Sequence, residues 1–171
     1  MIIKIFELNK LNSYNFNLHL IYGNNEGIKE DIIKSNYLKN FNGKVLKYEE
    51  QELLNSKNEF ISSLLTKSLF ETSKLIIVSR CSDKLSNLVT EILANEVIET
   101  KIIIKSSNLE KKSKLRNLFE KEEKLVCTPV YEDDYRSLNS VINIFLKEQN
   151  FNLSQEIKNI LIERSKGDRI N

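Results

Sequence analysis

Short apolar runs alternate with longer stretches of helical periodicity along most of the chain. Runs bounded by polar or turn-forming residues predict strands, and the periodic stretches between them predict crossover helices. The expected strands are Ile2–Phe6, Leu18–Tyr22, Lys44–Tyr48, Lys74–Ser79, Lys101–Lys105 and Lys124–Thr128. The expected helices are Glu26–Lys39, Lys57–Ser68, Lys84–Asn95 and Lys111–Lys121. This order predicts an α/β fold with a mostly parallel sheet, in which the all-apolar runs Leu75–Val78 and Ile102–Ile104 take central positions.

The pattern changes after the last expected strand. The acidic run Glu132–Asp134 favours a helix start, because carboxylates stabilise the positive end of a helix. Helically spaced apolar residues follow and are expected to pack on the domain: Leu138, Val141, Ile142 and Phe145. A break at 149–152 precedes a second helix with Ser154 as N-cap and Gly167 as its stop.

This second helix carries an apolar stripe of Ile157, Ile160 and Leu161, and the remaining chain offers it no partner. It is typical of the opening of a small helical domain. We therefore expect a nucleotide-fold domain over residues 1–149 and the first helix of a truncated helical lid over residues 150–171.

Composition excludes several classes of protein. The 26 basic and 24 acidic residues leave a net charge of only +2, so the overall balance demands neither nucleic acid nor an anionic membrane. Cys81 and Cys127 lack disulfide or zinc spacing and are interpreted as reduced thiols. No leader or membrane-spanning run is recognisable, which favours a cytoplasmic protein without a membrane partner.

The run Leu18–Tyr22 breaks at a glycine turn, Gly23–Asn24–Asn25–Glu26–Gly27, that enters a helix. A phosphate-binding loop has this outline but needs a longer glycine spacing, a lysine that reaches the phosphates and a hydroxyl for magnesium. Here the spacing is one residue short, Lys29 comes one residue late, and Glu30 stands where the hydroxyl should be. The turn therefore predicts the scaffold of a nucleotide-binding protein without its chemistry.

No expected strand ends in the Asp-Glu pair that positions magnesium and water in ATPases. Ile77–Val78 runs into Ser79–Arg80, and Ile103–Ile104 runs into Lys105–Ser106. We therefore assign no catalytic residue, metal ligand or cofactor.

Several blocks together resemble the delta subunit of the bacterial DNA polymerase III clamp loader, an AAA+ assembly. The blocks are Leu20–Gly27; Ser68–Phe70 with Lys74–Val78; Ile102–Ile104 with Leu109 and Lys114–Arg116; and Ile160–Asp168. Their order and spacing carry the resemblance, which covers about the N-terminal half of the family's layout. The rest of the lid and the C-terminal collar are absent.

The resemblance implies a P-loop NTPase-like, AAA+-like fold in a DNA replication protein that belongs to the DNA-directed DNA polymerase holoenzyme. A delta-type subunit binds and opens the DNA sliding clamp (the beta subunit) without hydrolysing ATP. Its other partners are the remaining loader subunits, and it meets DNA only indirectly.

In that family a Leu-Phe pair inserts into a pocket on the clamp, and the matching residues here are Leu69 and Phe70, with Thr66, Lys67 and Glu71 as a polar rim. If the helix from Lys57 continues to Phe70, the side chain of Phe70 points away from the buried face, as an interaction anchor would. The alternative is that the helix ends near Lys67 and both residues pack in the core.

Two other functions remain open. One is a nucleotide-dependent ATPase or phosphotransferase that uses Lys29 in a divergent loop. The other is a nucleic-acid-binding module that uses the basic helix from Lys111 to Lys121, although a solvated face explains that helix better.

Two single residues are given ordinary structural roles. Arg80 lies in a Ser-Arg-Cys tripeptide like the one that carries an arginine finger in the ATPase subunits of clamp loaders. There the tripeptide follows a later strand and helix, whereas here it directly follows the expected strand Lys74–Ser79, so we interpret Arg80 as a loop cation. His19 has no ligand or triad partner at the required spacing and is expected in the core.

Overall fold

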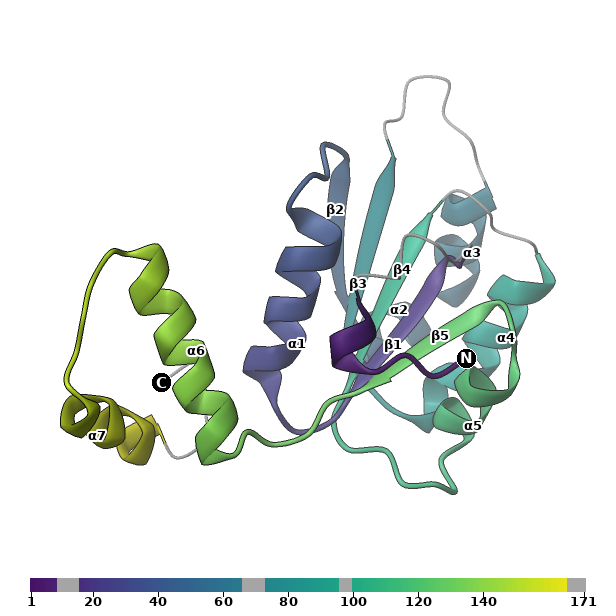
Figure 1. Ribbon diagram of the computed structural model, residues 1–171. Helices are drawn as coiled ribbons and strands as arrows, with labels where there is room; N and C mark the ends of the chain where they lie inside the picture. The colour runs from purple at the N-terminus through teal and green to yellow at the C-terminus, as the bar shows by residue number, and fades with distance from the viewer. Residues whose placement is uncertain (9–15, 66–72, 96–99, 166–171) are drawn as a thin grey trace.

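The core of the fold is a five-stranded parallel sheet with the strand order β2-β3-β4-β1-β5 (Figure 1). The computed structural model describes residues 1–8, 16–65, 73–95 and 100–165. The strands are β1 (Leu18–Tyr22), β2 (Lys44–Glu49), β3 (Lys74–Cys81), β4 (Lys101–Ser106) and β5 (Leu125–Pro129). The predicted α/β class and the interior positions of β3 and β4 are confirmed.

Helices cover both faces of the sheet. One face packs against α1 (Glu26–Ile33) and the π-helical turn η2 (Lys34–Leu38) that continues it. The other face packs against α2 (Glu50–Asn55), α3 (Lys57–Leu65), η3 (Asp83–Leu85), α4 (Ser86–Ala94) and α5 (Lys114–Lys121). Two apolar cores result, one on each side of the sheet, which explains why the central strands are apolar on both faces.

The prediction of a first strand over Ile2–Phe6 is wrong. Ile2 forms only an isolated bridge with Cys127, and residues 5–8 form a 3-10 turn. The run is apolar, but only Ile3 enters the core, whereas the Phe6 side chain is 77% exposed. The pairing therefore stops after one bridge, because the following residues gain no buried face.

Helix α2 was not expected from the sequence. It follows β2 directly and begins with a capping box, in which Glu49 accepts from the backbone at Glu52 and the Glu52 side chain accepts from the Glu49 N–H at 2.7 Å. Leu53 is its buried residue. A helix this short carries too little periodicity to stand out, so its sequence signal lies in the cap.

His19 lies in the core, as expected. It is fully buried, its Nδ1 is hydrogen-bonded to the Tyr37 hydroxyl, and its Nε2 lies 2.8 Å from the Thr128 hydroxyl. Burial, with a smaller contribution from the charge of Lys101, lowers the pKa of His19 from 6.5 to about 3. The imidazole is therefore neutral in the folded protein at physiological pH.

This low pKa predicts that acid destabilises the fold. Between about pH 6.5 and about pH 3 the unfolded chain binds a proton that the folded chain does not. The free energy of unfolding therefore falls by up to about 1.4 kcal/mol for each unit by which the pH is lowered. We expect urea unfolding of the wild type to lose stability more steeply over this range than unfolding of His19→Gln. Parallel pH dependences would contradict this assignment.

Helices α6 (Tyr135–Glu148) and α7 (Gln155–Ser165) form a hairpin. Asp134 caps α6 by accepting from the Ser137 N–H at 2.7 Å, and the Ser154 hydroxyl accepts from the Ile157 N–H at 3.4 Å, as predicted. Asn150, with φ of 51°, ends α6 where the break was expected. The predicted stop at Gly167 lies outside the described residues.

The apolar stripe of α6 does not pack on the sheet domain as expected. Leu138 is buried, but Phe145 is 60% exposed, and α6 packs mainly against α7. The hairpin also gives α7 a partner, which the sequence did not indicate. The division of the chain into residues 1–149 and 150–171 stays a prediction, and α6 and α7 contact each other across it.

Candidate functional site

The glycine turn lies at the carboxyl end of β1, between β4 and β5. Strands β2, β3 and β4 lie on one side of β1, and the crossover from β4 then leads to β5 on the other side of β1. Ligands of open parallel sheets bind at such switch points, outside the carboxyl ends of the strands. The predicted scaffold of a nucleotide site is therefore placed where a ligand would bind.

Gly23 is required here by a close approach of the backbone. Its φ is +140°, and a Cβ at this position would lie 1.8 Å from the carbonyl oxygen of Val130. The Val130 N–H also donates to the Tyr22 carbonyl at 2.8 Å. The backbone that continues β5 thus lies directly against the turn.

The start of α1 is hydrogen-bonded to the same segment after β5. The Asn25 side chain caps α1 by accepting from the Ile28 N–H at 3.0 Å, and its amide nitrogen donates to Asp133 at 2.8 Å. Gly27 lies buried in the first turn of α1. The sequence analysis missed Asn25 and Asp133, whose contact joins positions 108 residues apart.

Lys29 turns inward and not toward a phosphate position. Its side chain is 1% exposed, and its Nζ donates to the carbonyl oxygens of Gly23 at 2.8 Å and Ser106 at 2.9 Å. A carboxylate oxygen of Glu26 lies 2.5 Å away. The ammonium therefore has two carbonyl partners at the ends of β1 and β4 and a carboxylate partner at the start of α1, and its charge is balanced within the protein.

A second lysine completes this ion cluster. The Lys105 Nζ donates to Glu30 at 2.5 Å and lies 3.8 Å from Glu26. Glu30 occupies the sequence position where a phosphate loop carries its hydroxyl, and here it binds a protein cation. Two carboxylates and two ammonium groups thus neutralise one another beside the α1 N-terminus, where an anion would otherwise bind.

The neighbouring strand ends are also occupied by internal contacts. Glu50 accepts from the Ser82 N–H at 2.7 Å, and the Ser106 hydroxyl donates to the Cys81 carbonyl at 2.5 Å. Arg80, in the left-handed region with φ of 58°, pairs with Glu49 at 2.9 Å. The Arg80 side chain is 79% exposed, as expected for a loop cation. β3 itself carries no pair of carboxylates at this end.

The candidate clamp anchors Leu69 and Phe70, with the rim residues Thr66, Lys67 and Glu71, lie outside the described residues. Upstream of them, Phe60 and Ile61 are buried and α3 reaches Leu65, which is 48% exposed. The predicted helix is thus present as far as Leu65, and the roles of the five residues stay predictions.

The basic helix is shorter than predicted and partly committed to internal contacts. It begins at Lys114, with Ser113 as its cap. Arg116 donates to Glu120 at 2.7 Å and to the Leu109 carbonyl at 3.1 Å, and its guanidinium lies 5.3 Å from the centre of the Tyr22 ring. Lys111, Lys112, Lys114 and Lys121 are exposed, which agrees with a solvated face.

In the described part of the chain, no group of three or more His, Cys, Asp or Glu residues could hold a metal ion. No helix among the same residues is long and apolar enough to cross a membrane.

Comparison with known proteins gives matches in structure only. The sequence matches no family model and no curated protein. Domain III of the Thermotoga maritima replication initiation protein DnaA is similar, with a TM-score of 0.50 and 15% identity, over 94% of this chain and 75% of that one. The Bacillus subtilis DNA clamp loader delta protein YqeN has a TM-score of 0.59 and 12% identity, over 92% of this chain and 51% of that one.

A third similar structure is AMPPCP-bound DnaA from Aquifex aeolicus, with a TM-score of 0.54 and 19% identity. The match covers 91% of this chain and 53% of that one, so the chain spans about half the length of this DnaA and of YqeN. At these identities the likeness shows the fold. The chain has an AAA+-like fold, as predicted.

Proposed function

We propose that this chain is a replication protein of the clamp-loader delta type, which binds and opens the DNA sliding clamp by contact and does not hydrolyse ATP. One observation carries the proposal: Lys29 is buried against Gly23 and Ser106, and Glu26 stands beside it. The turn that binds phosphates in an ATPase is used here for internal packing. An AAA+-like domain built in this way works through its surface.

The proposed contact is a hydrophobic wedge of Leu69 and Phe70, with Thr66, Lys67 and Glu71 as its rim. In the sequence these residues lie between α3 and β3. Ring opening needs no hydrolysis by this chain, because a protein that binds the open ring better than the closed one shifts the ring toward opening. ATP would act on partner subunits.

The chain shares its fold with the clamp loader delta protein, which is consistent with this assignment. The DnaA structures share the fold, and one is described as AMPPCP-bound. In this chain Lys29 is bonded internally to Gly23 and Ser106, and the backbone at Val130 lies against the glycine turn. A nucleotide-free, contact-based role fits that difference.

The competing function, an ATPase or phosphotransferase that uses Lys29, makes an opposite prediction. We expect the purified chain to show no ATP turnover, and we expect Lys29→Ala to lower the free energy of unfolding by roughly 1–3 kcal/mol, because two buried carbonyls lose their donor. The measurements are phosphate release and urea unfolding, with Lys121→Ala as an exposed control. Turnover by the wild type that disappears in Lys29→Ala would support the enzyme.

A further inference from the structure

Helix α6 faces α1 and η2 across an open cleft with a volume of about 710 Å³. The α6 wall is mostly apolar, and Ile144 and Phe145 on it are 57% and 60% exposed. The opposite wall is polar. The lining residues are Asp31, Lys34, Ser35, Lys39, Val141, Ile144, Phe145 and Glu148. The apolar residues of α6 have the spacing of a helix face that is normally buried, so their exposure in this cleft is unusual.

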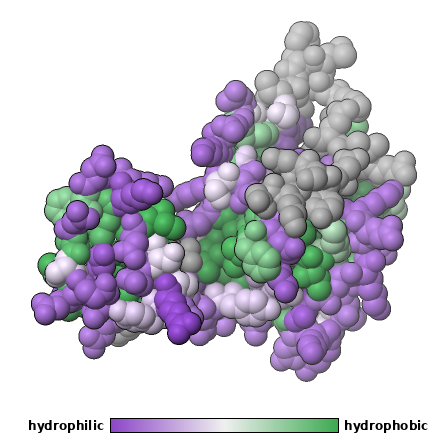
Figure 2. All heavy atoms as spheres, viewed as in Figure 1, coloured by the Kyte–Doolittle hydropathy of each residue, from purple (hydrophilic) through white to green (hydrophobic). Residues whose placement is uncertain are grey.

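Helix α7 presents a second apolar surface on its outer side. Ile157, Ile160 and Leu161 share one side of the helix and are 45%, 51% and 44% exposed. Ile162, which points about 100° away from Leu161, is 7% exposed. Figure 2 shows hydrophobic residues gathered on the surface of the α6–α7 hairpin.

The outer side of α7 cannot occupy the cleft of its own molecule. α7 is fixed to α6 by Lys158, which donates to Asn143 at 2.7 Å, and by Asn159, which is hydrogen-bonded to Tyr135. These contacts use a side of α6 other than the cleft wall. An α7 stripe that enters this cleft therefore comes from a second molecule.

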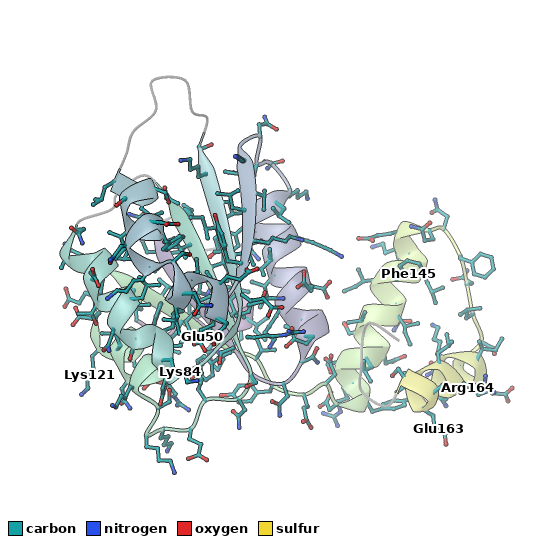
Figure 3. The ribbon with its side chains drawn as sticks, turned by 180° about the vertical axis from the view of Figure 1, so that it is seen from behind. Glu50, Lys84, Lys121, Phe145, Glu163 and Arg164 are labelled. Atoms are coloured by element: carbon teal, nitrogen blue, oxygen red, sulfur yellow. The ribbon has the colours of Figure 1, made fainter. Side chains whose placement is uncertain are left out.

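The two surfaces carry some exposed charges of opposite sign, while Asp31 also lies on the polar wall of the cleft. Glu156 and Glu163 lie along one flank of the α7 stripe, and Lys34 and Lys39 are exposed on the polar wall of the cleft. No carboxylate among the described residues pairs with either lysine. Arg164 is exposed near the C-terminal end of the stripe, and Glu148 lies on the α6 wall. Figure 3 shows Phe145 on α6, and Glu163 and Arg164 on α7.

We propose that α7 of one copy of this chain docks in the cleft between α1 and α6 of a second copy. Ile157, Ile160 and Leu161 cover Ile144 and Phe145, while the glutamates of α7 pair with Lys34 and Lys39. The two surfaces differ, so the contact is heterologous, and each added copy leaves one free stripe and one free cleft. This assembly is independent of nucleotide and of the clamp contact.

The test exploits this asymmetry. Ile160→Asp removes the stripe and leaves the cleft, whereas Phe145→Asp removes the cleft wall and leaves the stripe. In sedimentation velocity we expect the wild type to gain mass with concentration, and each variant to stay monomeric at concentrations at least about tenfold above the onset for the wild type. An equimolar mixture of the two variants should form a dimer and nothing larger, because one intact stripe meets one intact cleft.

Asn87→Asp, an equal change of charge at an exposed position of α4, is the matched control and should associate like the wild type. Circular dichroism of each variant checks that the exposed substitutions leave the fold intact. A wild type that is monomeric at every concentration would overturn the proposal. Association of a single variant at the wild-type concentration, or a mixture that stays monomeric, would do the same.

Discussion

Replacing both Leu69 and Phe70 by alanine is expected to weaken binding of a bacterial sliding clamp by on the order of 1,000-fold. Apolar anchors at the centre of an interface are worth about 2 kcal/mol or more each, and about 1.4 kcal/mol corresponds to a tenfold change in affinity. Surface plasmon resonance with immobilised clamp gives the dissociation constants of the wild type and of the double variant. Removal of rim side chains, as in Thr66→Ala, should change affinity only a few-fold, because rim contacts mainly exclude water.

The same double variant separates the wedge from a core role for these residues. If Leu69 and Phe70 are interaction anchors, thermal unfolding of the variant should match that of the wild type. If they pack in the core, their removal should lower the free energy of unfolding by several kcal/mol. A double variant that unfolds normally and binds the clamp as tightly as the wild type would refute the wedge.

Gly23→Ala is expected to be among the most destabilising single substitutions in the described chain. The new Cβ would lie 1.8 Å from the Val130 carbonyl oxygen at a φ of +140°, so the segment after β5 would have to move off the turn. We expect the free energy of unfolding to fall by roughly 3 kcal/mol or more. Urea unfolding followed by circular dichroism measures this loss.

The exposed neighbour Asn24 provides the control, because Asn24→Ala should stay within about 0.5 kcal/mol of the wild type. If Gly23→Ala were as stable as Asn24→Ala, the turn would not be held closed by Val130. The packing role assigned to the glycine would then be wrong.

Much of the fold could be predicted from hydrophobic periodicity, because buried strands such as β3 and β4 need apolar residues on both faces. Hydrophobic periodicity gives a wrong prediction where an apolar run is not buried. Ile2–Phe6 resembles a strand, yet Phe6 faces solvent and only one bridge forms. The stripe of α6 was expected on the sheet for the same reason, since a sequence shows which residues are apolar and not which surface covers them.

The defects of the glycine turn were visible in the sequence, but the fate of Lys29 was not. Its position after Ile28 suggested a misplaced lysine, whereas the structure gives it backbone partners at Gly23 and Ser106. Ser106 is 77 residues away in the chain. Contacts of that range depend on strand order, so no local pattern indicated that Lys29 would be buried or that Lys105 would join Glu30.

The central claim is that this AAA+-like domain acts by protein contact without a nucleotide. Calorimetric titration of a sliding clamp with the purified wild-type chain, in the absence and in the presence of ATP and magnesium, tests it most directly. We expect saturable binding with the same dissociation constant in both conditions. Absence of binding, or binding that requires ATP, would contradict the account.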